Sequence, residues 1–342
     1  MIEQSDKYYL NNRKHEKHVM KHLNIDDQST TSRSFDIKKL MIPLAFIVVL
    51  LIWTTTPLAI KWSSVDSPMT SASIRMAIGL LFCGSIVLLM HLGLLSKSGK
   101  THVFQTDRTA VKVYIVGGLS IFICMSLFYT AAQLIPSGWI AVLFGLSPLA
   151  TGLFSAMVEP ETKLTISRII GLLLGLAGLY LVFSAGLNFE DASILGVVLS
   201  LIAVVISSGS SVITRQLVKD ITLPGMQITT GSLIVALPCF IVSVLIQEPE
   251  LHFNFTEQAW QAIAYLGLIG TGVGFTAYYY LLKHVSANRI ALITLITPIS
   301  ALSVGSWLNN EPLLPEVWLG AALVCIGLLI YEFKPKLGLR RL

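Results

Sequence analysis

The feature that most constrains this chain is a series of long stretches that contain no Asp, Glu, Lys or Arg. They cover residues 40–60, 76–96, 113–158, 169–189, 192–214, 221–247, 258–282, 290–310 and 317–331. A helix needs about 20 apolar residues to cross the hydrocarbon core of a bilayer. The stretch 113–158 would be about 69 Å long as a helix at 1.5 Å per residue, which is enough for two crossings with a turn at Ile-Pro-Ser-Gly, residues 135–138. The pattern therefore predicts ten transmembrane helices.

The composition agrees with this membrane assignment. Of the 342 residues, 54% are hydrophobic and 13% are charged, whereas a soluble domain has roughly 25% charged residues. A closed transmembrane barrel is excluded because its strands alternate in polarity, and these stretches do not. The chain is predicted to be an all-α membrane protein that has the lipid bilayer as one partner.

The positive charges predict the orientation of the chain in the membrane. If the N-terminus lies inside, then the tail, the loops after the second, fourth, sixth and eighth helices, and the C-terminus hold 22 of the 24 Lys and Arg residues. Such a bias is typical of cytoplasmic loops. We therefore expect an inner (plasma) membrane protein with both termini in the cytoplasm. The net charge of +5 is read as a topology signal, and no nucleic-acid partner is expected.

The two halves of the chain resemble each other. Pairs of similar residues recur at a spacing of about 150 residues: Gly117 and Gly267, Tyr129 and Tyr279, Ser147-Pro148 and Thr297-Pro298, Lys61 and Arg215, and Gly171 and Gly178 with Gly320 and Gly327. A repeat with an odd number of helices inserts its second copy upside down, and inverted repeats are typical of secondary transporters. The predicted parts are a polar tail 1–39, repeats 40–190 and 191–335 of five helices each, and a basic C-terminus 336–342.

Two prolines are expected near the bilayer midplane, Pro148 and Pro298. Each removes a backbone donor and frees a carbonyl four residues earlier. Freed backbone within a membrane is tolerated where neighbours bond it or where it lines a cavity. A cavity is favoured by the symmetric placement of the prolines, with a packing kink as the alternative.

Two polar segments occupy corresponding places in the halves: WTTTP at 53–57 and ISSGSS at 206–211. Interrupted helices at matching places indicate a transport site, although small residues also allow close helix packing. Arg75 lies inside a predicted helix, where a charge is costly and usually has a role. Its side chain could pair internally, gate anions, or extend to the outer interface. The candidates for the wall of a substrate cavity are Trp53, Thr54, Thr55, Arg75, Tyr129, Ser147, Pro148, Thr151, Ser208, Gln227, Tyr279, Thr294, Thr297, Pro298 and Ser300.

The sequence lacks several residues and motifs that proton coupling, ATP hydrolysis or enzymatic catalysis would require. The uncharged stretches offer no embedded carboxylate for proton coupling. Glu159 and Glu311 directly follow predicted helices and are expected to cap helix ends. No GxxxxGK[ST], HExxH or GxSxG motif occurs. The chain is therefore predicted to be neither an ATPase nor an enzyme, and to need no cofactor. The spacing of His15, His18 and His22 fits a solvated basic tail better than a metal site.

These features resemble the EamA-like family of the drug/metabolite transporter superfamily. The resemblance covers residues 40–333 and rests on the W-x-x-x-[FP]-x-x-x-K stretch from Trp53 to Lys61, Arg75 after Pro68, and the segments AAQLIPSGWIAVLFGLSPLATGLFSAMVEP (131–160) and KHVSANRIALITLITPISALSVGSWLNNEP (283–312). It implies a central cavity with helices 5 and 10 at the periphery, and substrates such as amino acids and other small metabolites, often exported. The chain departs from the family at Thr54, Val158, Asn310 and the SSGSS row, and these departures alter the candidate cavity wall.

The predicted function is secondary transport, in the direction of export, of a small polar metabolite by alternating access. One alternative is exchange of sugar phosphates or nucleotide sugars, which would use Lys283 and Arg289 at helix ends. Another is a membrane sensor without transport activity, whose output element is the N-terminal tail. A homodimer is left open by the sequence.

Overall fold

A computed structural model describes most of the chain after the N-terminal tail. The described residues are 37–65, 67–94, 104–158, 165–186, 191–219, 221–248, 250, 254–285, 287–311 and 314–332. His15, His18, His22 and Glu159 lie outside them, as does the side chain of Arg289. The chain divides into two compact units, residues 1–41 and residues 42–342, and the second is described below.

The described residues form helices and no strands, which confirms the all-α prediction. The helices are α2 (Ile37–Ser63), α3 (Pro68–His91), α4 (Arg108–Leu134), α5 (Ser137–Phe144), α6 (Ser147–Val158), α7 (Ile166–Gly186), α8 (Asp191–Leu217), α9 (Gly225–Gln247), α10 (Glu257–Tyr265), η1 (Leu266–Phe275), α11 (Thr276–His284), α12 (Ala287–Asn309) and α13 (Pro315–Glu332). Seven helical segments in this part of the chain are long and apolar enough to cross a membrane: Leu40–Ser63, Pro68–His91, Arg108–Leu134, Ser137–Val158, Ile194–Leu217, Gly225–Gln247 and Glu257–His284. Three shorter apolar helices accompany them: Ile166–Val182, Ile293–Asn309 and Pro315–Tyr331.

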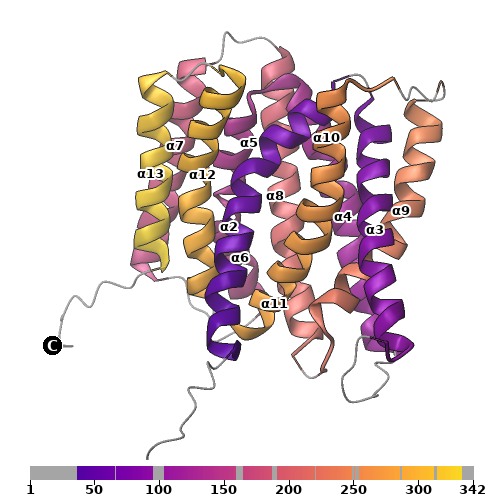
Figure 1. Ribbon diagram of the computed structural model, residues 1–342. Helices are drawn as coiled ribbons and strands as arrows, with labels where there is room; N and C mark the ends of the chain where they lie inside the picture. Colours follow the sequence, from indigo (N-terminus) through magenta and orange to yellow (C-terminus); the bar gives the residue numbers. More distant parts are fainter. Residues whose placement is uncertain are drawn as a thin grey trace, which may run out of the picture. The chain divides into compact units, whose positions relative to one another are not determined.

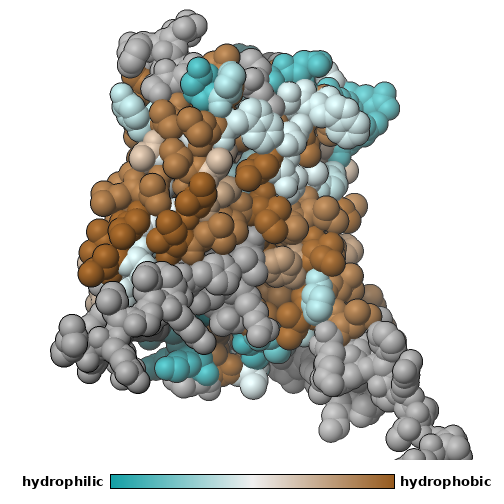
Figure 2. Space-filling view, turned by 90° about the vertical axis from the view of Figure 1, so that its left-hand side faces the viewer, coloured by the Kyte–Doolittle hydropathy of each residue, from teal (hydrophilic) through white to brown (hydrophobic). Residues whose placement is uncertain are grey.

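Large apolar side chains are exposed on the outside of the unit formed by residues 42–342. Leu173 and Tyr180 of α7 are exposed, as are Leu319 and Ile326 of α13. Figure 2 shows apolar residues across the middle of one face, with polar residues above and below them. A monomeric soluble protein rarely exposes such a large apolar patch. The surface is therefore that of an integral membrane protein.

The helices in the centre of the unit pack against one another. In Figure 1, α4 packs against α8 and α9, and α6 packs against α8. Helix α12 contacts α5, while α3 contacts both α9 and η1. Residues from both halves of the chain therefore share one core.

Helices α7 and α13 lie side by side and pack through glycines (Figure 1). A Cβ atom added to Gly171 would lie 2.5 Å from the carbonyl oxygen of Gly327, and one added to Gly178 would lie 2.5 Å from that of Gly320. The backbones can approach this closely only because these residues lack side chains. The glycines that reveal the repeat in the sequence thus meet each other in the structure.

The two prolines of the repeat have different effects on their helices. The segment predicted as one helix after the turn at 135–138 is broken between Phe144 and Ser147 into α5 and α6, and Pro148 lies in the first turn of α6. Proline is tolerated there because the first-turn amides have no partner within their helix. In contrast, α12 continues through Pro298, whose Cγ would be 2.9 Å from a Cβ on Gly145. The break occurs only in the first half of the described chain.

Between α10 and α11, the span contains a π-helix, η1, where the sequence predicted an α-helix. Two of the four glycines in this segment allow α3 to come close: a Cβ on Gly267 would lie 2.7 Å from Ile78 Cβ, and one on Gly272 would lie 2.5 Å from Phe82 Cδ1. π-Helical turns are rare in proteins, and those that occur are often found at functional sites.

Candidate functional site

A cavity of about 370 Å³ lies among the central helices. Its wall is built from α2, α4, α5, α6, α7, α8, η1, α11, α12 and α13. The lining runs from Trp53, near the middle of α2, to Arg215, close to the end of α8, and to Arg168 at the start of α7. Small-molecule sites are typically concave and of 300–1,000 Å³, so the cavity can hold one small metabolite.

Hydroxyl groups form two rows along the cavity. Ser147, Thr151 and Ser155 are spaced four residues apart on α6 and therefore share one face of that helix. Opposite them, Ser208 Oγ of α8 donates to the backbone oxygen of Ser147 at 3.1 Å. The hydroxyl of Ser211 lies 3.2 Å from that of Tyr278. The serine row of α8 therefore bonds to the broken helix on one side and to α11 on the other.

Aromatic rings cover the deeper part of the cavity. The ring of Trp53 meets Phe144 edge to face, with centroids 5.4 Å apart, and lies 5.2 Å from Tyr278. The rings of Phe128 and Phe144 are 6.0 Å apart. Such pairs are favourable beyond the area they bury. They leave an apolar, rigid surface next to the hydroxyl rows.

The charged residues that line the cavity are both cations. Arg168 has its guanidinium carbon 5.5 Å from the centroid of the Tyr331 ring. Arg215 is half-buried and makes no hydrogen bond or ion pair with any residue that the structure describes. No Asp or Glu is found among the described lining residues. The charges that the described lining contributes are therefore positive.

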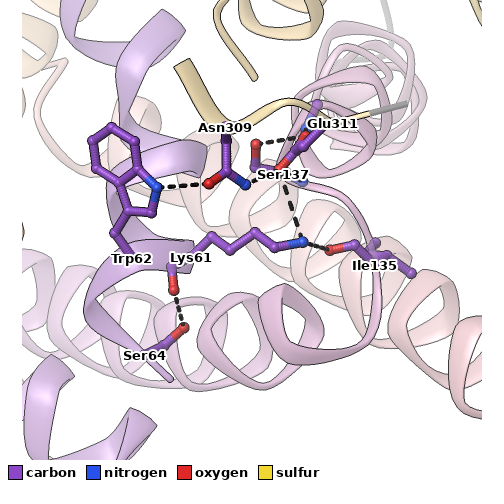
Figure 3. A network of polar contacts seen from close by, with 8 residues as sticks. Lys61, Trp62, Ser64, Ile135, Ser137, Asn309 and Glu311 are labelled. Carbon is purple, nitrogen blue, oxygen red and sulfur yellow. Dashed lines mark hydrogen bonds and ion pairs between the residues drawn. The ribbon is translucent and has the colours of Figure 1, made fainter. Parts of the chain in front are cut away.

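A network of polar contacts joins three elements at the other end of the helices (Figure 3). Glu311 is 8% exposed and accepts hydrogen bonds from the Ser137 amide at 3.1 Å, the Ser137 hydroxyl at 3.0 Å and the Gly138 amide at 3.3 Å. Lys61 Nζ lies 3.8 Å from the same carboxylate and donates to Ile135 O at 3.2 Å. The contacts join the end of α2 and the segment after α12 to the N-terminus of α5.

Neighbouring residues extend this network. Trp62 Nε1 donates to Asn309 Oδ1 at 2.9 Å, and Asn309 Nδ2 donates to Glu311 at 3.1 Å (Figure 3). The side-chain amide of Gln133 donates to the backbone oxygen of Ser64. We refer to Lys61, Trp62, Ser137, Asn309 and Glu311 as the polar lock. Glu311 thus caps a helix end as the sequence predicted, although the helix is α5 of the other half.

Glu248 caps a second helix N-terminus. It follows α9 and accepts hydrogen bonds from the amides of Met69 and Thr70, both at 2.9 Å, and from the Thr70 hydroxyl at 2.6 Å. A carboxylate is favoured here because the first amides of a helix lack partners and carry a partial positive charge.

Arg75 is buried away from the cavity, with 1% of its surface exposed. Its Nε donates to Thr271 Oγ1 of η1 at 3.0 Å, and its guanidinium carbon lies 6.0 Å from the centroid of the Tyr129 ring. Because the side chain is enclosed, the interpretation that it extends to the outer interface is wrong. Arg75 instead joins α3 to η1 and α4.

The cavity contains seven of the predicted site residues: Trp53, Ser147, Pro148, Thr151, Ser208, Tyr279 and Thr294. The others lie outside its lining: Thr54, Thr55, Arg75, Tyr129, Gln227, Thr297, Pro298 and Ser300. A substrate role for any of them stays a prediction.

The residues outside the lining have other contacts. The hydroxyl of Thr55 lies 2.5 Å from that of Tyr265 and also donates to Leu51 O at 3.1 Å. Gln227 Oε1 accepts from the Gln105 amide at 3.3 Å. Pro298 packs beside Gly145 within the continuous α12 and lies outside the lining, whereas Thr294, four residues earlier, is part of it.

Thr54 and Thr297 are buried, and Ser300 is half-buried. The hydroxyl of Thr297 has no hydrogen-bond partner among the residues that the structure describes. All three lie on apolar helices and outside the cavity lining. Helical spacing alone could not tell which side of α2 or α12 meets the cavity.

Sequence reasoning treated Arg168 and Arg215 only as topology signals. Arg215 could have been found, because it lies four residues after Ser211 and so continues the serine row on the same face of α8. Arg168 had no such signal. Its place in the cavity depends on how α7 packs beside α6 and α13.

Comparisons with known proteins give a consistent result. Residues 40–184 and 194–332 each match the EamA-like transporter family. The chain is 26% identical over 294 residues to the uncharacterized transporter YoaV of Bacillus subtilis, covering 85% of this chain and 96% of that protein. It is 24% identical over 240 residues to a probable amino-acid metabolite efflux pump of Escherichia coli, covering 68% and 80% respectively. A solved crystal structure matches with a TM-score of 0.64 at 21% identity, over 88% of this chain and 99% of that one. This last likeness concerns the fold.

Proposed function

The chain belongs to the EamA-like transporter family, and on this premise we propose that it exports a small polar metabolite, such as an amino acid, by alternating access. The observation that carries the proposal is the contrast between the two ends of the helices. The cavity reaches the end where α8 and α11 finish, and the polar lock joins α2, α5 and the segment after α12 at the opposite end. A pathway open at one end and closed at the other is what alternating access requires.

The proposed architecture is ten transmembrane helices in two inverted repeats of five. Two separate matches to the same family support the duplication. Seven long apolar segments and three shorter ones in the described chain supply enough helices for ten crossings. With α5 and α6 counted as one crossing and α10, η1 and α11 as another, each matched segment contains five.

The direction and the substrate class are drawn from a relative and from the positive-inside pattern. The relative named a probable amino-acid metabolite efflux pump supports amino-acid export. A relative named an inner membrane transporter in Escherichia coli, 26% identical over 309 residues, supports an inner membrane location. With both termini in the cytoplasm, the cavity would open inward in this conformer, where an exporter takes up its substrate. A homodimer remains compatible with this proposal.

Transport is tested with the purified full chain in proteoliposomes. The vesicles are loaded with a panel of radiolabelled amino acids and nucleobases, and efflux is measured against vesicles that lack protein. We expect saturable flux for at least one amino acid. Folded protein with no flux for any member of the panel would contradict the proposal.

The same preparation tests the competing exchange of sugar phosphates. Arg168 and Arg215 line the cavity, so an anionic substrate has a physical basis. Vesicles loaded with a sugar phosphate should show no counterflow if the substrate is an amino acid. Replacing Lys283 and Arg289 by Gln, singly and together, should leave the amino-acid flux unchanged.

A further inference from the structure

We propose that the cavity recognises its substrate through one carboxylate, which Arg215 binds, while an apolar part of the molecule packs against Trp53 and Tyr278. The proposal rests on the proposed function and narrows its substrate class to small monocarboxylates. A substrate must then carry a carboxylate to bind, whereas the amino group of an amino acid is not required for binding.

The first argument is charge. Arg215 is half-buried at the cavity wall and has no hydrogen-bond or ion-pair partner in the described part of the chain. The described lining has no Asp or Glu that could neutralise it. A positive charge in a partly dry site attracts an anion more strongly than a charge in bulk water does. The planar guanidinium matches a carboxylate, which can accept two parallel hydrogen bonds.

The second argument concerns how many negative charges the site accommodates. Arg168 lines the same cavity, but its guanidinium lies over the Tyr331 ring. Arg215 is then the cation that faces the cavity without a partner. One guanidinium balances one negative charge, so a monoanion suits this site better than a phosphate monoester with nearly two charges.

The third argument is the distance between the cation and the aromatic surface. Arg215 is one turn beyond Ser211, a rise of about 6 Å along α8. The hydroxyl of Ser211 is 3.2 Å from that of Tyr278, whose ring is 5.2 Å from Trp53. A carboxylate at Arg215 therefore places a short apolar chain within reach of these rings. The 370 Å³ cavity has room for one such molecule.

The amino group of an amino acid would find no carboxylate in the described wall. Ring faces and hydroxyl oxygens are its available partners, and cation–π contacts of this kind are modest. Removing the amino group should therefore weaken binding little. Removing the carboxylate should abolish the main polar contact.

The test uses purified full-length protein in detergent and isothermal titration calorimetry with four probes that share one apolar chain. The probes are leucine, isocaproate, isopentylamine and isopentyl phosphate. We expect binding of leucine and isocaproate with dissociation constants within about tenfold of each other, and at least tenfold weaker binding of isopentylamine and isopentyl phosphate. A hydrogen bond to a charged group contributes about 1.5–3 kcal/mol, which corresponds to a loss of roughly 10–100-fold.

Variants assign this selectivity to one side chain. Arg215→Gln should weaken isocaproate binding at least tenfold, and Arg215→Lys should restore part of it. Lys283→Gln is the matched control, since Lys283 is an exposed cation at the end of α11 outside the lining and should have no effect. Size-exclusion profiles verify folding. If Arg215→Gln does not fold, the four-probe series on the unmodified protein decides by itself.

The outcomes separate this proposal from the proposed function. Tighter binding of isopentylamine than of isocaproate overturns carboxylate recognition, even if the proteoliposomes transport the amine. Tighter binding of isopentyl phosphate would identify a phosphate site instead. Carboxylate-selective binding that depends on Arg215, together with no flux of any probe, would support the site and overturn the transport function.

Discussion

The two ends of the helical unit place similar cations in different surroundings. Lys61 and Arg215 occupy corresponding positions, because they are separated by the same number of residues as the starts of the two segments that match the family. Lys61 lies 3.8 Å from the carboxylate of Glu311, which also caps α5. Arg215 lines a cavity and has no hydrogen-bond or ion-pair partner in the described chain. One end therefore satisfies its charges internally, while the other leaves a charge for a ligand or water.

This difference indicates what holds the conformer. The bonds of the polar lock exist only while α2, α5 and the segment after α12 stay together. At the Arg215 end, hydroxyl groups of α8 hydrogen-bond to α6 and α11, but no ion pair joins the described residues. Weakening the lock should affect stability or access from the closed end, whereas changes at the cavity wall should affect substrate binding.

Glu311→Ala should have the largest effect on stability. It leaves the amides of Ser137 and Gly138 without their acceptor and Lys61 without its ion pair. Each buried donor left without its acceptor costs about 1–3 kcal/mol, and we expect a total loss of roughly 3–5 kcal/mol. Thermal unfolding in detergent measures it. Glu316→Ala, at an exposed acid in the first turn of α13, is the control; an equal effect of both variants would contradict the lock.

Glu248→Ala should destabilise the protein less, by about 2 kcal/mol. The variant removes the acceptor of two amides and one hydroxyl at the start of α3, and capping residues typically contribute 0.5–2 kcal/mol. No ion pair with a described Lys or Arg is broken. The same unfolding measurement applies, and a loss larger than that of Glu311→Ala would show that the cation is unimportant to the lock.

Lys61→Gln should change access more than stability. The Lys61 side chain is 31% exposed, and partly solvated ion pairs contribute at most about 1 kcal/mol. Losing up to about 1 kcal/mol would raise the fraction of molecules that are open at the polar-lock end by up to about fivefold. A reporter cysteine at Ser155, which lines the cavity, is placed in a chain whose four free cysteines are replaced. An impermeant maleimide added on the lock side should label the variant faster than the parent.

Labelling of the same reporter from the cavity side gives the comparison for Lys61→Gln. In Lys61→Gln, labelling from the cavity side should be slower than in the parent, because alternating access does not allow both ends of the pathway to be open at once. Faster labelling from both sides would indicate general loosening, and unchanged rates would remove Lys61 from the lock.

The smallest expected effect is that of Thr54→Val. Thr54 is buried outside the lining, so loss of its hydroxyl should leave flux within about twofold of the parent and stability within about 1 kcal/mol. Thr151→Val removes a hydroxyl of the same kind from the cavity wall and should lower flux severalfold. Rates are compared in proteoliposomes at matched protein content. Equal losses in both variants would show that the cavity wall does not select the substrate.

The glycines and prolines show how far sequence reasoning reached. The spacing of Gly171 and Gly178 predicted a duplication, but not that these glycines touch Gly327 and Gly320 across the α7–α13 contact. Pro148 correctly indicated an interrupted helix beside the cavity. Pro298, in contrast, lies within the continuous α12 beside Gly145 and outside the cavity lining. A proline's effect depends on what packs against it.

The sequence by itself determined the membrane character, the helical class and the family, because each follows from local hydrophobicity, charge distribution and motifs along the chain. It also identified the row of serines on α8 and the aromatic Trp53. Only the tertiary structure decided that Arg215 faces the cavity while Lys61 is paired, and that Arg75 is enclosed against Thr271. The partners of a charge come from distant parts of the chain, and their approach is set by helix packing.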